Sequence, residues 1–177
     1  MSEELTPLAQ GSLYGIAKNA LHDVAAAYAA RQGVSFAWGR VFFLYGDGEK
    51  RERLVPSLID AFLHGRTPEL RCPDVRRDYL HVDDVAAAFV AILKGQFEGA
   101  VNIASGEAIS LGAIGRKIAG ILRCAPPEWQ SKTEQQAPSL VLGDTRRLND
   151  IIRFKPTTTW DVGLTAMIEK ERRTMLP

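Results

Sequence analysis

Two spacings of apolar residues alternate along the 177-residue chain, and together they predict a protein of mixed helices and strands. From residue 11 to about 31, apolar side chains recur every three or four positions, as on one face of an α-helix. Gly33 follows, in the position that favours a helix end. Residues 34–46 read VSFAWGRVFFLYG, which is rich in β-branched and aromatic residues and apolar on both alternations. This pattern predicts a strand buried on both faces of a parallel sheet.

The alternation continues through the rest of the chain. A second helix is expected to end near residue 63, and residues 66–78 read as a loop with a short strand near 69–71. Further strands are predicted at 79–82, 101–104 and 139–142, and a long connection at 124–138. The expected helices begin at Asp83 or Asp84, at Ser110, at Asp144 (a short one), and at a capping box of Thr158 and Asp161 that leads to about residue 173. Helices that alternate with buried strands indicate the α/β class.

Composition narrows the class of protein further. Hydrophobic residues make up 46% and charged residues 24%, which is typical of one globular domain with a real core. The formal net charge is +1, so we expect no partner among nucleic acids or anionic membranes. No apolar run reaches membrane-spanning length, the polar start is unlike a signal peptide, and Cys72 and Cys124 match no metal or redox spacing. A cytoplasmic protein with reduced thiols is therefore expected.

The candidate chemistry lies in the first predicted helix, in the stretch GSLYGIAKNAL. Tyr14 and Lys18 stand four residues apart, so a helix presents them on one face, with Cβ atoms about 5–6 Å apart. An ammonium group beside a phenol favours the phenolate, and such a pair moves a proton on or off a hydroxyl while a hydride is transferred. A YxxxK spacing also arises by chance, and taken alone it is explained more simply by a surface helix with an ordinary tyrosine.

Other candidate groups have structural explanations. A helix cap with first-turn charge accounts for Asp83 and Asp84 better than a metal site or paired-carboxylate catalysis does. A buried, hydrogen-bonded histidine accounts for His81 better than a catalytic one. Aromatic residues at strand spacing are expected to belong to the core: Phe36, Trp38, Phe42 and Phe43.

Five segments in order are far more specific than any single motif: SLYGIAK, GRVFFLYG, RRDYLHVDDVAAAF, VNIASGEAISL and GDTRRL…FKPTTTWDVGL. Over essentially the whole chain they resemble the C-terminal half of the extended short-chain dehydrogenase/reductase superfamily, and within it the NAD-dependent nucleotide-sugar epimerase/dehydratase family. The resemblance implies the C-terminal part of a Rossmann-like, doubly wound parallel sheet plus a small α/β substrate-binding lobe, with the N-terminal dinucleotide-binding strands absent. Residues 1–50 would carry the catalytic helix and a strand of the sheet. Residues 51–177 would form mainly the substrate lobe, with about 79–104 returning to the main sheet.

The resemblance also implies roles for single residues. Tyr14 matches the catalytic tyrosine, and Lys18 matches the lysine that tunes it and binds the nicotinamide ribose of NAD or NADP, so both would contact the cofactor. Arg40 and Phe43 fall in the segment that borders the active-site cleft, and both are expected to contact substrate. Arg77 matches the arginine that meets the diphosphate of the nucleotide sugar, as a guanidinium fork suits phosphate oxygens. A surface ion pair with a neighbouring carboxylate is the alternative role for Arg77.

Several positions depart from the family pattern. Phe43 stands where relatives often have Asn, and Asp47 where they often have Pro. Residues 132–139 read KTEQQAPS and hold no arginine, although some relatives place a second phosphate-binding arginine there, so diphosphate binding is expected to depend more on Arg77. The 15 glycines form neither G-x-G-x-x-G nor G-x-x-G-x-x-G, and the upstream catalytic Ser or Thr is also missing. The cofactor site is therefore expected to be incomplete in this chain.

Three functions remain open from the sequence. The first is the C-terminal portion of an NAD(P)-dependent epimerase or dehydratase that oxidises a nucleotide sugar transiently and is inactive as an isolated chain. The second is a non-catalytic partner or binding subunit of a split protein, and the third is a truncated remnant. The expected partners are a nucleotide-sugar substrate and either a second copy, which would dimerise through the Tyr14 helix, or a chain that carries the missing half.

Overall fold

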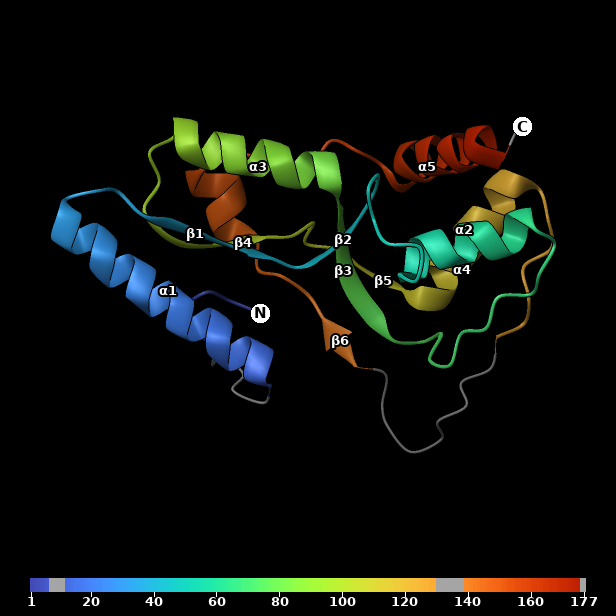
Figure 1. Ribbon diagram of the computed structural model, residues 1–177, viewed down its shortest axis with the longest axis horizontal. Helices are drawn as coiled ribbons and strands as arrows, with labels where there is room; N and C mark the ends of the chain where they lie inside the picture. Colours follow the sequence, from blue (N-terminus) through green and yellow to red (C-terminus); the bar gives the residue numbers. More distant parts are fainter. Residues whose placement is uncertain (7–11, 130–138, 176–177) are drawn as a thin grey trace.

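Helices and strands alternate along the chain, as the α/β prediction requires (Figure 1). The computed structural model describes residues 1–6, 12–129 and 139–175. Its elements in order are α1 (Leu13–Gln32), β1 (Ala37–Val41), β2 (Phe43–Tyr45), α2 (Leu54–Leu63), β3 (Arg76–His81), α3 (Val82–Lys94), β4 (Gly99–Ile103), β5 (Ala108–Ser110), α4 (Leu111–Leu122), β6 (Leu140–Val141), the π-helix η1 (Arg147–Ile151) and α5 (Trp160–Met175).

The predicted strand at 34–46 is wrong as a single element, because the chain changes partner in its middle. β1 pairs in parallel with β4, and β2 pairs in parallel with β3. At the break, Phe42 N donates to Ile103 O at 3.1 Å, which is the last link to β4 before the chain crosses to β3. β3 also pairs with β5 in antiparallel and with β6 in parallel orientation. β3 is therefore the strand on which three others meet.

Burial of this strand on both faces is also wrong. The first four residues of β1 are only half-buried, and among the described strands β1 pairs with β4 alone. The half-buried rings of Phe36 and Trp38 lie against His22 of α1, with centroids 5.9 and 5.3 Å from its ring. Phe43 is 40% exposed. The four aromatic residues expected in the core therefore lie outside the fully buried set.

The fully buried side chains form two clusters. One joins α2, α4 and α5 through Leu58, Ile114, Ile118 and Leu164, and the three helices lie together at one end of the molecule (Figure 1). The other joins α3, β4 and η1 through Ile92, Val101, Ile103 and Leu148. The first cluster makes a helical lobe beside β2 and β3, and the second packs α3 against the β1–β4 pair.

The first helix lies apart from both clusters (Figure 1). Its predicted ends are close to those observed: Ser12 Oγ accepts a hydrogen bond from Gly15 N at 3.1 Å, and Gly33 has a φ of 66°. Ala29 is its only buried residue among those described, whereas Leu13 is 83% and Val24 68% exposed. The apolar stripe that predicted this helix therefore faces outward.

Several element boundaries differ from prediction for local reasons. His81 rather than Asp83 or Asp84 caps α3, because its Nδ1 accepts from Asp83 N at 3.3 Å. Thr159 rather than Thr158 stands at the start of α5, where its Oγ1 accepts from Val162 N at 3.4 Å. β3 begins three residues earlier than expected, and residues 69–71 form no strand. Ser110 caps α4 as predicted. Most of the predicted connection, at 130–138, lies outside the described residues.

Within the described part of the chain, no helix combines the length and the apolar character needed to cross a membrane.

Candidate active site

The structure brings Tyr14 and Lys18 together at the beginning of α1. The Ser12 cap starts the helix just before them, and Lys18 Nζ lies 5.7 Å from the centroid of the Tyr14 ring. Tyr14 is 74% exposed. The first turn is at the end of α1 nearer to the middle of the molecule (Figure 1). The pair therefore shares one helix face, as its spacing predicts, and its phenol is open to a ligand.

Arg77 lies at the beginning of β3, and the structure brings it together with Phe43. Its Cζ is 5.6 Å from the centroid of the Phe43 ring. Its guanidinium donates to the carbonyl and hydroxyl oxygens of Ser139, at 2.7 and 2.9 Å. None of the ion pairs among residues 1–6, 12–129 and 139–175 includes Arg77, so the alternative of a carboxylate partner has no support there. The charge of this side chain is oriented by neutral groups.

Aromatic rings continue from Arg77 along the same face of β2 and β3, because alternate residues of a strand point the same way. Phe43 lies opposite Tyr79, with ring centroids 5.4 Å apart, and Tyr79 meets Trp160 of α5 edge-on at 6.0 Å. Trp160 stacks on Tyr45 at 4.2 Å and 9°. Burial raises the pKa of Tyr45 and of Tyr79 to about 12, so both remain neutral phenols near pH 7. The Phe43 ring, which lies under the Arg77 guanidinium, is thus packed at one end of a continuous row of aromatic rings.

Asp78 is a structural residue of the site that the sequence interpretation missed. Its side chain is fully buried, and its Oδ1 accepts from the backbone N and the hydroxyl of Ser105 at 2.8 and 2.6 Å. Its Oδ2 accepts from Gly106 N at 3.1 Å and from Gly143 N at 3.0 Å. These bonds tie β3 to the loops after β4 and β6. A carboxylate directly after two arginines and before the apolar pair Tyr79 and Leu80 was the available signal.

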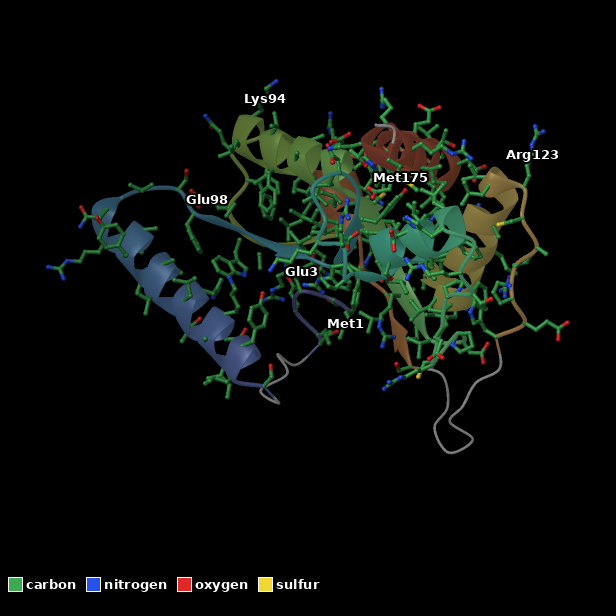
Figure 2. The ribbon with its side chains drawn as sticks, turned by 45° about the vertical axis from the view of Figure 1, so that its right-hand side comes forward. Met1, Glu3, Lys94, Glu98, Arg123 and Met175 are labelled. Carbon is green, nitrogen blue, oxygen red and sulfur yellow. The ribbon has the colours of Figure 1, made fainter. Side chains whose placement is uncertain are left out.

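Arg40 lies on β1 and contacts the segment that precedes α1. Its Nη1 donates to Glu3 O at 3.2 Å, while Asn102, its register partner on β4, donates from its backbone N to Glu3 Oε1 at 2.8 Å. Figure 2 shows Met1 and Glu3 in the middle of the molecule, between α1 and the helical lobe. Arg40 therefore binds the N-terminal segment of the chain at Glu3 in this structure. Its expected contact with substrate stays a prediction.

The first turn of α3 is held by two side chains that the sequence interpretation considered. The prediction of a buried, hydrogen-bonded His81 is confirmed, since the residue is buried and caps α3. Asp84 accepts from Thr157 N and Thr158 N, both at 3.0 Å. Burial opposes ionisation of Asp84, but the hydrogen bonds from the two threonines outweigh it and lower its pKa. No group of three or more metal-ligating side chains occurs in the part of the chain that the structure describes.

A polar cleft of about 620 Å³ opens beside the aromatic row, on its α5 side. Its lining includes Tyr79, Trp160, Lys117 and Lys155, but neither Arg77 nor the Tyr14–Lys18 pair. No hydrogen bond, ion pair or aromatic contact among the described residues links that pair to Arg77 and Phe43. The structure thus assembles two separate parts of a site.

Comparison with known proteins gives a consistent family. Residues 1–104 match the NAD dependent epimerase/dehydratase family. The CDP-abequose synthase of Salmonella typhimurium is 30% identical over 87 residues, which are 48% of this chain and 29% of that protein. The chain therefore spans less than a third of this curated relative.

Two solved structures resemble nearly the whole chain. MoeE5 in complex with UDP-glucuronic acid and NAD is 30% identical, with a TM-score of 0.81 over 99% of this chain and 60% of that one. The dTDP-glucose 4,6-dehydratase of Bacillus anthracis in complex with NAD is 22% identical, with a TM-score of 0.82 over 96% of this chain and 55% of that one, a likeness of fold alone. These similarities confirm the prediction of a partial Rossmann-like α/β fold.

Proposed function

Because the chain belongs to the NAD dependent epimerase/dehydratase family, we propose that it supplies the proton-transfer pair and the diphosphate site of an enzyme that epimerises or dehydrates a nucleotide sugar. The observation that carries this proposal is the Arg77 guanidinium, which lies over Phe43 and is bound by neutral oxygens rather than by a carboxylate. A positive fork of this kind suits phosphate oxygens. The binding of UDP-glucuronic acid by MoeE5, at 30% identity, is consistent with it.

The chemistry of Tyr14 and Lys18 follows from their shared helix face. The phenolate oxygen of Tyr14 accepts a proton from a sugar hydroxyl, and the carbon of that hydroxyl loses a hydride, so that a keto sugar forms. The Lys18 ammonium lies 5.7 Å from the Tyr14 ring and has protons for a ribose hydroxyl of the cofactor. NAD or NADP, held at its nicotinamide ribose by Tyr14 and Lys18, would supply the hydride acceptor and donor. In the return step Tyr14 gives the proton back.

The described residues fit only one end of such a cofactor. Lys18 and Tyr14 suit the nicotinamide ribose, but the 177 residues contain no glycine-rich turn of the kind that binds a dinucleotide pyrophosphate at a helix N-terminus. We therefore propose that the isolated chain binds a nucleotide sugar better than it binds NAD. A partner with the dinucleotide-binding strands, or a second copy docked on α1, would cover the exposed apolar face of that helix.

The two buried clusters suggest how the proposed roles divide. The cluster of α3, β4 and η1 belongs with β1 and the Tyr14 helix to the cofactor side, and the cluster of α2, α4 and α5 forms the substrate lobe. The proposed division into residues 1–50 and 51–177, with about 79–104 returning to the sheet, differs from this one at η1, which also packs in the cluster on the cofactor side. β3 joins the two, since Arg77 is at its start and α3 follows its end.

A second function, a non-catalytic binding subunit, is favoured by the lack of a glycine-rich turn within the 177 residues. Both functions predict nucleotide-sugar binding through Arg77. They differ in turnover, because a binding subunit has no use for the Tyr14 phenol.

The decisive experiment measures turnover of a nucleotide sugar by this chain together with a dinucleotide-binding half. Tyr14→Phe is expected to lower turnover by about 10²–10⁴-fold, the usual contribution of a general acid–base. Nucleotide-sugar affinity should change little, because the ring remains. Tyr28→Phe, an exposed tyrosine on the same helix, is the matched control and should retain full activity. Full turnover by Tyr14→Phe would refute the catalytic assignment.

A further inference from the structure

We infer that Ser139 is a positioning residue for Arg77, which it holds with one edge of the guanidinium turned toward a phosphate group. This inference rests on the proposed function, in which Arg77 meets the diphosphate of a nucleotide sugar. Ser139 immediately precedes β6, 62 residues along the chain from Arg77. It belongs to the stretch where no second phosphate-binding arginine occurs.

The hydrogen bonds of Arg77 leave one particular edge of its fork open. A guanidinium has five N–H donors in one plane. Nη1 donates to Ser139 O at 2.7 Å and to Arg76 O at 2.8 Å, and Nη2 donates to Ser139 Oγ at 2.9 Å. Within the described residues, Nε–H and the second N–H of Nη2, the one on the Nε side, have no acceptor. These two donors lie side by side on one edge, which is the arrangement that binds two oxygens of a phosphate.

Two further contacts limit movement of this fork. The Phe43 ring lies 5.6 Å from Arg77 Cζ, so rotation out of the plane would lose a cation–π contact. Ser139 is itself held by the β3–β6 pairing, because its carbonyl oxygen also accepts from Arg76 N at 3.1 Å. The guanidinium is thus held at its end by Ser139 and over its face by Phe43.

Neutral acceptors suit this role better than a carboxylate would. A carboxylate partner would orient the fork but would also cancel its charge and compete with phosphate. The carbonyl and hydroxyl oxygens of Ser139 orient the fork and leave the positive charge for the ligand. A side chain that is already oriented also loses less conformational entropy when the ligand binds.

The test is a double-mutant cycle on the 177-residue chain, with calorimetric titration of UDP-glucose as the probe. Ser139→Ala should weaken binding by about fivefold, the usual effect of one hydrogen bond. Ser139→Thr keeps the hydroxyl and should restore the affinity. In an Arg77→Ala background, Ser139→Ala should have no further effect, because nothing is left to position. Ser57→Ala removes a hydroxyl whose hydrogen bond, among the described residues, is to Leu54 O in α2, and it serves as the matched control.

Each outcome separates the inference from the proposed function. Unchanged affinity in Arg77→Ala, or no binding by the unsubstituted chain, counts against the proposed anion site. Unchanged affinity in Ser139→Ala, when Arg77→Ala binds weakly, overturns the role of Ser139 alone. An equal loss from Ser139→Ala in both backgrounds makes Ser139 a direct ligand and also overturns it.

A second measurement needs no ligand. Nuclear magnetic resonance relaxation of the Arg77 Nε–H group should report an ordered side chain in the unsubstituted protein and in Ser139→Thr, and a less ordered one in Ser139→Ala, which keeps only the two carbonyl bonds of Nη1. An equally ordered Arg77 in Ser139→Ala would overturn the inference whatever the titrations give. Equal thermal midpoints for the variants would confirm that the fold is unchanged.

Discussion

Helices α1 and α4 have similar sequence patterns, but their apolar residues differ in burial in the structure. Both carry apolar residues at helical spacing and both begin at a serine cap. In α4, Ile114 and Ile118 are completely buried, whereas in α1 Leu13 and Val24 are largely exposed and only Ala29 is buried. The spacing of apolar residues therefore determines that a helix forms and where its apolar face lies. Whether that face is covered depends on which partner the rest of the fold provides.

The partners of the two helices explain the difference. Helix α4 packs between α2 and α5, whose own apolar faces complete one buried cluster. Within the part of the chain that the structure describes, the aromatic contacts of α1 join His22 to Phe36 and to Trp38 of β1. Contiguous exposed apolar patches commonly mark interaction surfaces of proteins. The contrast is therefore between a lobe whose apolar side chains are buried within this chain and a helix whose apolar side chains are exposed.

The largest expected effect compares one buried leucine with one exposed valine. Leu164→Ala, in the core between α4 and α5, should lower the free energy of unfolding by about 2–5 kcal/mol, since it leaves a cavity. Val24→Ala on α1 should change it by less than about 0.5 kcal/mol. Urea unfolding curves of the two variants measure both values. A comparable loss in Val24→Ala would mean that the α1 face is packed in solution.

A smaller effect is expected on association of the chain with itself. The exposed face of α1 should make the 177-residue chain self-associate, and placing charge there should oppose this. Leu21→Lys with Val24→Lys should lower the association constant at least about tenfold, because burial of unpaired ammonium groups is unfavourable. Val162→Lys, at a similarly exposed valine of α5, is the control. If sedimentation finds a monomer for every variant and for the unsubstituted chain, the exposed face of α1 does not drive self-association.

The smallest effect concerns the loop that leads into the packed lobe. Glu49 Oε2 is buried and has no hydrogen-bond partner among the described residues. Burial raises the pKa of Glu49 from 4.5 to about 7, against the opposing charge of Arg53. The protonated form is favoured in the folded state, so its stabilising contribution is full below about pH 4.5 and is lost as the pH rises through about 7.

Glu49→Gln removes this titration. Relative to the unsubstituted chain, the variant should therefore gain stability as the pH rises from about 4.5 to about 7, as measured by unfolding at each pH. Asp47 in the same loop is paired with Lys170, and the hydrogen bond from Lys170 lowers its pKa. Asp47→Asn should accordingly show the opposite sign, losing stability relative to the parent above its low pKa. A constant difference between Glu49→Gln and the parent at every pH would contradict the proposed protonation of Glu49.

Local sequence predicted some features well because their physical cause is local. Gly33 ends α1 with a positive φ that glycine adopts without strain, and Ser110 caps α4 with its own hydroxyl. The pairing of Tyr14 and Lys18 follows from helical geometry alone. A prediction that required knowledge of a distant neighbour was wrong: Asp83 or Asp84 was expected to cap the helix, but the Asp84 carboxylate binds Thr157 and Thr158, 73 and 74 residues away.

The sequence by itself determined the alternation of helices and strands, the apolar face of each helix, and the candidate residues of the proposed site. Only the tertiary structure decided that the chain changes partner at Phe42, that Asp78 joins β3 to two loops, and that Ser139 meets Arg77. The physical reason is distance along the chain. Helix spacing and caps depend on residues within about one turn, whereas strand pairing and the orientation of a long side chain depend on segments that only the complete packing brings together.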